Sequence, residues 1–296
     1  MLQYFANGII LGITLALGAI GLTLTYNILR FANFAHGEYL TFGAYFALVF
    51  VSLFAGTSSL GPFTFGWGFL LALVLAAVLT AGLTLLVDWL LFRLLRRRRI
   101  ETTLVIASFG ASLLLRALVV FIWGPQPQYY SHNIAIAIPV LPGVRLTADE
   151  VFVIALTIVL MILLHLFLTR TRLGKAMRAV SDNPALSSVT GINVANVIRW
   201  TWIVGGTLAA VAGVFVGLTV QVAPEMGFNL ILPMFAAAIL GGVGSIYGAV
   251  LGGLIIGVAE SMSVPVIGAA YMPAVGFGLM FLVLLFYPKG ILGDRS

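Results

Sequence analysis

The 296-residue sequence contains no cysteine and very few charged residues. The absence of cysteine excludes disulfide bonds and thiolate metal sites, and it leaves the cellular compartment open. Only 8% of the residues are charged and 61% are hydrophobic, whereas an ordinary soluble domain has about 25% charged residues. No soluble fold could cover so large an apolar core, so the composition predicts a membrane protein.

Long apolar runs fill most of the chain, and several approach the ~20 residues that cross ~30 Å of hydrocarbon. Runs and breakers predict about eight segments, near residues 3–27, 35–55, 66–92, 102–123, 151–168, 197–220, 231–262 and 271–287. The connections between them leave no room for a soluble domain. We therefore predict an all-α integral membrane fold in which residues 1–296 form a single transmembrane domain.

Most of the positive charges lie in two short basic segments. Of the 15 Lys and Arg, five fall in residues 93–99 and four in residues 170–178. Because cytoplasmic loops carry an excess of Lys and Arg, both segments should face the cytoplasm, and nucleic-acid binding is not needed to explain the net charge of +6. The first charged residue is Arg30, so the N-terminus lacks the basic region of a cleaved signal peptide and its apolar run should be retained.

The two basic segments also fix the predicted topology. They place the connection 124–150 outside, but counting every span as complete puts both termini outside and leaves Lys289 on the wrong face. Broken or re-entrant paths at 35–55 and 231–262 would return both termini to the cytoplasm. Those segments are rich in glycine and polar residues, as irregular backbone at membrane depth requires, so we favour this version.

A weak internal repeat points the same way. A shift of 205 residues along the printed sequence aligns Gly8, Gly12, Thr14, Gly37, Gly43 and Ala44 with Gly213, Gly217, Thr219, Gly242, Gly248 and Ala249. Many transporters are built from repeats of this kind and handle substrate at the interface between them. Chance matches between small residues in apolar sequence are the alternative.

Motifs for catalysis and for ATP binding are absent from the sequence. The glycine-rich stretch 241–245 lacks the lysine of a phosphate-binding P-loop, and close helix packing explains its glycines better. The sequence has no HExxH or GxSxG motif. The histidines are His36, His132 and His165, in separate segments. We therefore predict a protein that is not an enzyme, with no catalytic residue, metal site or cofactor.

The most unusual stretch is 33–39, which places several polar side chains between apolar segments. An ionisable side chain at the centre of a membrane helix costs ~2.5 to 3.5 kcal/mol on insertion scales, so such residues usually face a cavity or a partner. The candidate substrate-pathway residues are Asn33, Phe34, His36, Glu38, Tyr39 and Glu260. The alternative is an ordinary loop in which Glu38 is a first-turn acid of the next helix.

Arg116 also lies inside an apolar segment, where a charge requires a partner or a route to the interface. It could pair with Glu260 or with Glu38. A side chain that extends to the outer surface is the alternative.

The connection 169–196 contains signals for a short helix. Asp182 is predicted to cap it, with Pro184 in its first turn and Gly191 at its end. A short helix beside basic residues on the cytoplasmic side is suited to docking a soluble partner. A basic loop that only fixes topology is the alternative.

Residues 33–38, 174–193, 238–260 and the ending Tyr-Pro-Lys-Gly-Ile-Leu-Gly at 287–293 together resemble the LivH-type permease of bacterial branched-chain amino acid ABC importers. The resemblance covers nearly the whole chain in order. It implies an ABC importer permease fold, with several spans in the bacterial cytoplasmic membrane, that forms half of a translocation pathway. It also implies three kinds of partner: a second related permease subunit, two cytoplasmic ATP-binding subunits, and a periplasmic or lipid-anchored substrate-binding protein.

By this resemblance the short helix is the coupling helix that contacts an ATP-binding subunit. The coupling residues implied are Arg178, Asp182, Asn183, Pro184, Ala185, Leu186 and Gly191. Ordinary coupling loops carry Glu-Ala-Ala before a glycine, whereas Arg178 stands here with Ala179 and Val180.

The substrate remains open at this point, because permeases for urea and short-chain amides are similar. Two other classes of function also remain. An ion-coupled transporter or channel would work without an ATPase, and a scaffold subunit would have no pathway of its own.

Overall fold

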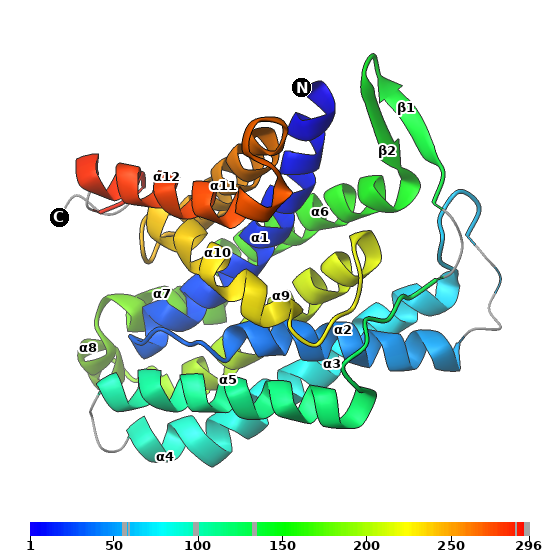
Figure 1. The fold of residues 1–296 in the computed structure, drawn as a ribbon. Helices are drawn as coiled ribbons and strands as arrows, with labels where there is room; N and C mark the ends of the chain where they lie inside the picture. The colour runs from blue at the N-terminus through cyan, green and yellow to red at the C-terminus, as the bar shows by residue number, and fades with distance from the viewer. Residues whose placement is uncertain (55–57, 59, 97–100, 132–134, 288, 293–296) are drawn as a thin grey trace.

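Most of the chain is helical, as the apolar runs predict (Figure 1). The computed structural model describes residues 1–54, 58, 60–96, 101–131, 135–287 and 289–292. The helices of the first half are α1 (Leu2–Leu29), α2 (His36–Leu53), α3 (Trp67–Val87), the π-helix η1 (Asp88–Phe92), α4 (Arg93–Arg96) and α5 (Glu101–Trp123). A hairpin of β1 (Ala137–Leu141) and β2 (Val144–Thr147) follows. The second half contains α6 (Ala148–Arg170), α7 (Arg172–Asp182), α8 (Pro184–Val189), α9 (Val194–Thr219), α10 (Met226–Gly241), α11 (Ile246–Ile267), the 3₁₀-helix η2 (Ala269–Tyr271) and α12 (Met272–Phe286).

The predicted segment 231–262 is two helices rather than one. Among the described residues, seven helical segments are long and apolar enough to cross a membrane, and α11 is one of them, whereas α10 is a shorter apolar helix. The chain turns between them at Gly242 and Gly244, whose φ angles of 110° and 101° favour glycine. The predicted break at 231–262 is therefore confirmed.

The predicted break at 35–55 is wrong. Residues His36–Leu53 form one continuous helix, α2. The irregular backbone lies just before it, where α1 ends at Arg30 in the left-handed conformation with φ 58°. The polar side chains from which we predicted a broken helix lie instead at the start of a continuous one.

The two termini lie on opposite sides of the molecule. Near the N-terminus, the Gln3 amide donates to the Arg145 carbonyl oxygen over 3.0 Å, which places it beside the hairpin that topology puts outside. At the other end, Ile291 N–H donates to the Leu240 carbonyl oxygen over 2.9 Å, at the cytoplasmic end of α10. Our prediction of two cytoplasmic termini is therefore wrong for the N-terminus, because α2 is one complete helix and not a break that returns the chain to its starting side. The turn between α10 and α11 is what places the C-terminus on the cytoplasmic side.

The α1–α2–α3 and α9–α10–α11 segments form two similar units with opposite orientation. Helix α1 packs on α9 and α2 packs on α10, while α3 contacts α9 in the way that α11 contacts α1. The N-terminal ends of α2 and α10 meet inside the molecule, where the Gly227 N–H donates to the Thr41 hydroxyl over 3.0 Å. Each unit thus contains a helix that begins at depth after an irregular connection, an arrangement that membrane transporters use around their substrate sites.

The repeat predicted by the shift of 205 residues is nevertheless wrong. It pairs Gly37, in the first turn of α2, with Gly242, which follows the end of α10. It also pairs Gly43, in the middle of α2, with Gly248, near the start of α11. Small residues recur in both places because helices pack closely there, so the match reflects packing and not equivalent positions.

Glycines bring α1 and α11 into backbone contact, and this contact gives a stability prediction. A Cβ atom added at Gly12 would lie 2.8 Å from the Leu254 Cα atom, whereas one added at Gly82 in α3 would meet nothing within 4 Å. We expect Gly12→Ala to lower the free energy of unfolding by about 1 to 3 kcal/mol because the helices must separate. Gly82→Ala should leave it unchanged or raise it. Denaturation of the two purified variants measures the contrast, and equal stabilities would contradict this packing.

Candidate functional site

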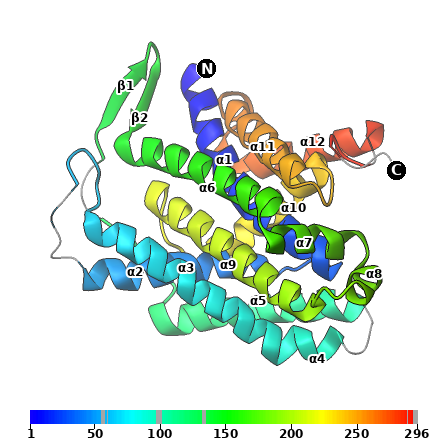
Figure 2. The same cartoon turned by 180° about the vertical axis from the view of Figure 1, so that it is seen from behind.

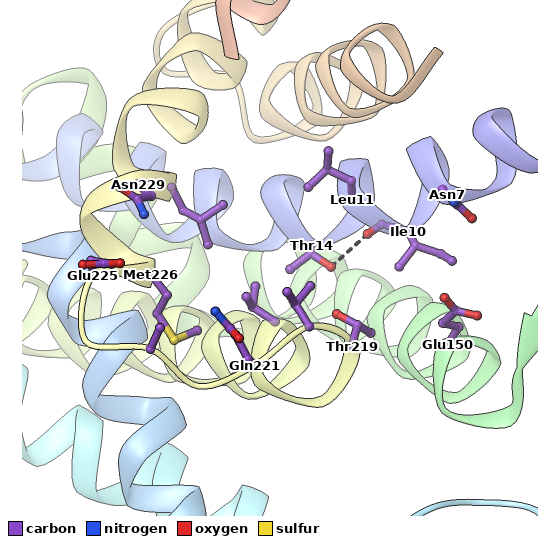
Figure 3. A pocket seen from close by; sticks show the side chains of 14 residues that line it. Asn7, Ile10, Leu11, Thr14, Glu150, Thr219, Gln221, Glu225, Met226 and Asn229 are labelled. Carbon is purple, nitrogen blue, oxygen red and sulfur yellow. Dashed lines mark hydrogen bonds between the residues drawn. The ribbon is translucent and has the colours of Figure 1, made fainter. Parts of the chain in front are cut away.

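A cavity of about 390 Å³ lies in the outer half of the molecule between α1, α9 and α10 (Figure 3). It is bounded by the connection 220–225, which joins α9 to α10, and by the first turn of α6. Its polar lining side chains are Asn7, Thr14, Glu150, Thr219, Gln221, Glu225 and Asn229. We call it the outer cavity. Concave sites of this size, mostly apolar with a few polar groups, are typical of small-molecule binding.

The two carboxylates of the outer cavity lie at opposite ends of it, with apolar side chains such as Ile10 and Leu11 between them (Figure 3). Glu150 accepts a hydrogen bond from the Thr147 N–H over 2.7 Å, in the capping box that starts α6. Glu225 lies 3.5 Å from the Arg116 guanidinium. The cavity therefore combines an acidic group at each end with an apolar centre, which suits a small solute that carries both a cationic group and an apolar one.

Thr14 and Thr219 have already committed their hydroxyls to the helices that carry them. The Thr14 hydroxyl donates to the Ile10 carbonyl oxygen and the Thr219 hydroxyl to the Phe215 carbonyl oxygen, each over 2.9 Å. A hydroxyl that has donated in this way can still accept a hydrogen bond. At the wall of the outer cavity, Gln221 accepts a hydrogen bond from the Tyr129 hydroxyl over 3.2 Å, so its amide N–H groups remain to donate.

The connection 124–131 holds the outer end of α9 and the 220–225 connection in place. The Gln128 N–H donates to the Val222 carbonyl oxygen over 2.8 Å, and the reverse bond is 2.9 Å long. The Tyr130 hydroxyl donates to the Ala44 carbonyl oxygen over 2.9 Å. Burial raises the pKa of Tyr130 well above its ordinary value, so the hydroxyl stays a donor.

The predicted pathway residues lie apart from the outer cavity, at the buried start of α2. Asn33 accepts a hydrogen bond from the Ala35 N–H over 3.2 Å, and the His36 ring nitrogen lies 3.0 Å from the Gly18 carbonyl oxygen. Glu38 accepts from the Ser112 hydroxyl over 3.3 Å, and Tyr39 packs edge-on against a tryptophan. These hydrogen bonds tie the connection between α1 and α2 to α1 and α5 inside the protein, while Asn33 Nδ2 and Glu38 Oε2 are buried without a hydrogen-bond partner in the described part of the chain.

The other two predicted pathway residues have different surroundings. The Phe34 ring packs against Phe109 at 5.9 Å and Phe235 at 5.2 Å between ring centroids. Glu260 is buried on α11 beside Gly276 of α12, so it does not join the cluster at α2. The structure thus brings together five of the six residues and leaves Glu260 apart.

Arg116 has a different partner from those that the sequence suggested. It pairs with Glu225 and lies over the Phe228 ring at 5.1 Å from the ring centroid. Neither partner was singled out by sequence reasoning, because residues 220–230 read as a short connection between apolar segments. The sequence does contain a signal for a polar site here: Gln221, Glu225 and Asn229 are polar residues at four-residue spacing in an otherwise apolar stretch.

On the cytoplasmic side, α7 and α8 form a compact feature between α6 and α9. The cap of α8 is Asn183, which accepts a hydrogen bond from the Leu186 N–H over 2.9 Å, so the predicted cap Asp182 is wrong. Asp182 instead ends α7, because the chain is extended at the residue before Pro184. Gly191, with φ 89°, follows the end of the helix as predicted.

All seven predicted coupling residues are exposed. Helix α8 also presents two apolar side chains: Leu186 is 61% exposed and Val189 is 84% exposed. On the inner face of α7, Met177 and Val180 are buried. At the end of α1, the Arg30 guanidinium donates to the Ser181 carbonyl oxygen, which ties α7 to α1.

Comparison with known proteins decides what the chain is. The model of the family described as the branched-chain amino acid transport system permease component matches residues 4–286. The chain belongs to this permease family. Membership confirms the resemblance seen in the sequence.

Curated relatives cover nearly the full length of the permease. It is 36% identical over 299 residues to the high-affinity branched-chain amino acid transport system permease protein BraD of Pseudomonas aeruginosa, covering 99% of this chain and 95% of BraD. It is 34% identical to LivH of Escherichia coli strain K12, with the same two coverages of 99% and 95%. A probable LivH of Methanocaldococcus jannaschii is 31% identical and covers 94% of this chain and 88% of the relative.

The permease is therefore a multi-pass protein of the cytoplasmic membrane and a permease subunit of an ABC importer. It works within an ABC transporter complex. The predicted all-α membrane fold and location are confirmed.

Proposed function

We propose that the permease forms half of the translocation pathway for branched-chain amino acids, and that its outer cavity receives the substrate. The observation that carries the proposal is the composition of this cavity. A carboxylate stands at each end of the cavity, Glu225 at one and Glu150 at the other, and either one can accept the ammonium group, while the Gln221 amide offers donors to the carboxylate. Apolar side chains such as Leu11 and Met226 would surround the branched side chain.

The proposed partners are a second related permease subunit, two cytoplasmic ATP-binding subunits and a periplasmic or lipid-anchored substrate-binding protein. ATP hydrolysis belongs to the ATP-binding subunits, and residues 1–296 act as a single transmembrane permease domain. Helix α8, with its exposed Leu186 and Val189, is the proposed contact with an ATP-binding subunit. The buried cluster around Glu38 is proposed to hold the inner part of the pathway by fixing where α2 begins.

Movement of α8 would reach the outer cavity through a chain of contacts between helices. Helix α7 contacts α8, and Arg30 joins α7 to the end of α1. Asn7 and Thr14, in the N-terminal half of α1, line the outer cavity. A shift of α8 when the ATP-binding subunits close would therefore tilt α1, provided that ATP binds the two states with different affinity.

Reconstitution tests the proposed function. The permease is placed in liposomes with its ATP-binding subunits, second permease and binding protein, and uptake of labelled leucine is measured. We expect ATP-dependent uptake that excess isoleucine or valine suppresses and urea does not. Suppression by urea or acetamide alone would instead assign an amide substrate, and uptake that persists without the ATP-binding subunits would assign an ion-coupled transporter.

The link from α7 to α1 is tested at Arg30. Both Arg30→Gly and Arg30→Ala remove the contact with Ser181, so both should lower the import rate by about tenfold, as loss of ~1.4 kcal/mol of coupling predicts. Arginine and alanine are both strained at this left-handed position, by about 1 to 2 kcal/mol relative to glycine, so Arg30→Ala should unfold more easily than Arg30→Gly. Import at the wild-type rate in Arg30→Gly would contradict the link.

A further inference from the structure

A second cavity, of about 500 Å³, lies at the cytoplasmic ends of α3 and α9. Its lining includes Asp88, Trp89, Arg93, Arg96 and Arg199. Figure 2 shows the end of α3 and α4 running beside the start of α9, and α3 contacts α9 along its length. Neither the outer cavity nor α8 shares any of these residues. We call it the arginine cavity.

The π-helix η1 shapes one wall of the arginine cavity. Its wider turn directs Asp88 and Phe92 inward, where both are buried, and leaves Trp89 and Arg93 exposed. The Phe92 ring stacks on the Trp202 ring of α9, with 5.3 Å between the ring centroids and 9° between the ring planes. Since π-turns are uncommon and frequent at functional sites, this local distortion marks the wall as specialised.

A hydrogen bond fixes the same two walls at a second point. The Thr84 hydroxyl donates to the Trp202 carbonyl oxygen over 3.0 Å. With the ring stack, it holds the end of α3 against the first turns of α9. The arginine cavity is therefore preformed between two helices that cannot easily move apart.

Positive charge in the arginine cavity exceeds negative charge. Arg96 pairs with Asp88 at 2.6 Å. In the described part of the chain, no carboxylate lies within ion-pair distance of Arg93 or Arg199, and both side chains are exposed. One carboxylate thus faces three guanidinium groups, which favours an anion that accepts several charge-assisted hydrogen bonds.

The position of the arginine cavity identifies the source of that anion. The adjacent side chains that face outward are apolar: Trp89 is 61% exposed, and Leu90 and Leu94 are exposed beside it. Tryptophan prefers the membrane interface, and the topology puts this end of α3 at the cytoplasmic leaflet. An anion at this depth, bordered by lipid-facing apolar side chains, is the headgroup of a phospholipid.

We propose that the arginine cavity binds the phosphate of an anionic phospholipid from the cytoplasmic leaflet. Arg93 and Arg199 are the phosphate ligands, while Arg96 stays paired with Asp88. The acyl chains lie along Leu90 and Leu94. Basic pockets between membrane helices on the cytoplasmic side bind such headgroups. The lipid holds the end of α3 against α9. Since α9 directly follows α8, lipid binding stabilises the part of the protein next to the proposed coupling helix.

The test compares lipid stabilisation of two double variants of the full-length permease in detergent. Arg93→Gln with Arg199→Gln removes the proposed ligands. Arg170→Gln with Arg172→Gln removes the same charge from the cytoplasmic side of α6 and α7. Each protein is titrated with phosphatidylglycerol, with phosphatidylcholine and with inorganic phosphate, and its Tm is followed. Native mass spectrometry counts the bound lipids.

We expect phosphatidylglycerol to raise the Tm of the wild type and of the control variant by roughly 5 °C, as specific binding to the folded state predicts. The Arg93 and Arg199 variant should lose at least about half of this shift and one bound lipid per chain. Equal shifts in the two variants would overturn the proposal. So would an equal effect of phosphatidylcholine or of inorganic phosphate.

The cytoplasmic position also allows an acidic surface of an ATP-binding subunit as the occupant. Co-purification of the ATP-binding subunits with the Arg93 and Arg199 variant separates the two. Loss of those subunits with an undiminished lipid shift would overturn the lipid assignment, whereas retained subunits with a diminished shift would support it. Because uptake is not measured, failure of this proposal is distinct from failure of the proposed function.

Discussion

Replacement of Leu186 and Val189 of α8 by aspartate is expected to lower import by at least about 100-fold, because each is a large exposed apolar side chain on the proposed contact with an ATP-binding subunit. An aspartate buried in a contact without a partner costs about 2 kcal/mol or more, so the double change should weaken the contact by roughly 1,000-fold. Uptake into proteoliposomes and co-purification of the ATP-binding subunits both measure the effect. Replacing residues 182–190 by a glycine-serine linker should abolish the association.

The matched control places the same substitution on the other side of the membrane. Ile136 is 80% exposed and precedes β1 on the outer face, so Ile136→Asp adds a charge at an exposed apolar position without touching α8. ATP-binding subunits should co-purify normally with this control. Full assembly of the complex around the α8 double variant would show that α8 is not the coupling helix.

Filling the outer cavity is expected to have an effect of similar size on import but none on assembly. Asn229 is exposed at the cavity wall on α10, and Asn229→Trp would occupy a large part of the 390 Å³ volume. We expect uptake to fall by about 100-fold, since overfilling a site of this kind costs several kcal/mol. Labelled substrate uptake gives the measurement, and the ATP-binding subunits should still co-purify.

Asn229→Leu separates the volume of this side chain from its polarity. Leucine is close to asparagine in size but lacks the amide, so it should reduce uptake far less than tryptophan if volume decides. A large loss in both variants would assign the effect to the amide instead. Uptake within twofold of the wild type in Asn229→Trp would exclude the outer cavity from the pathway, provided that the Tm shows a folded protein.

The coupling region shows how far local signals reach. Asn183, Pro184 and Gly191 are a cap, a first-turn proline and a terminating glycine, and each acts through bonds to its nearest neighbours. Sequence reasoning therefore found the short helix and missed its cap by one residue. Asp182 and Asn183 are both good caps, and the choice between them depends on where α7 ends, which is a matter of packing.

The pathway residues show where such reasoning stops. The free-energy cost of placing polar side chains among apolar ones correctly identified Glu38 and His36 as residues that need partners. In the structure these partners are the Ser112 hydroxyl and the Gly18 carbonyl oxygen. They could not show that these partners lie inside the protein. The partners come from α5 and α1, so only the assembled helices determine whether a polar group closes the interior or faces a cavity.

Composition and charge by themselves determined that this protein is helical and spans the membrane, and they predict that its basic loops face the cytoplasm. Those properties follow from the transfer of each segment between water and hydrocarbon, which depends on that segment alone. Tertiary structure alone decided that α1 lies at the centre, that Arg116 meets Glu225, and that α1, α9 and α10 enclose the outer cavity. The reason is physical: lipid and protein interior are both apolar, so a helix buried among helices and one facing lipid have the same kind of sequence.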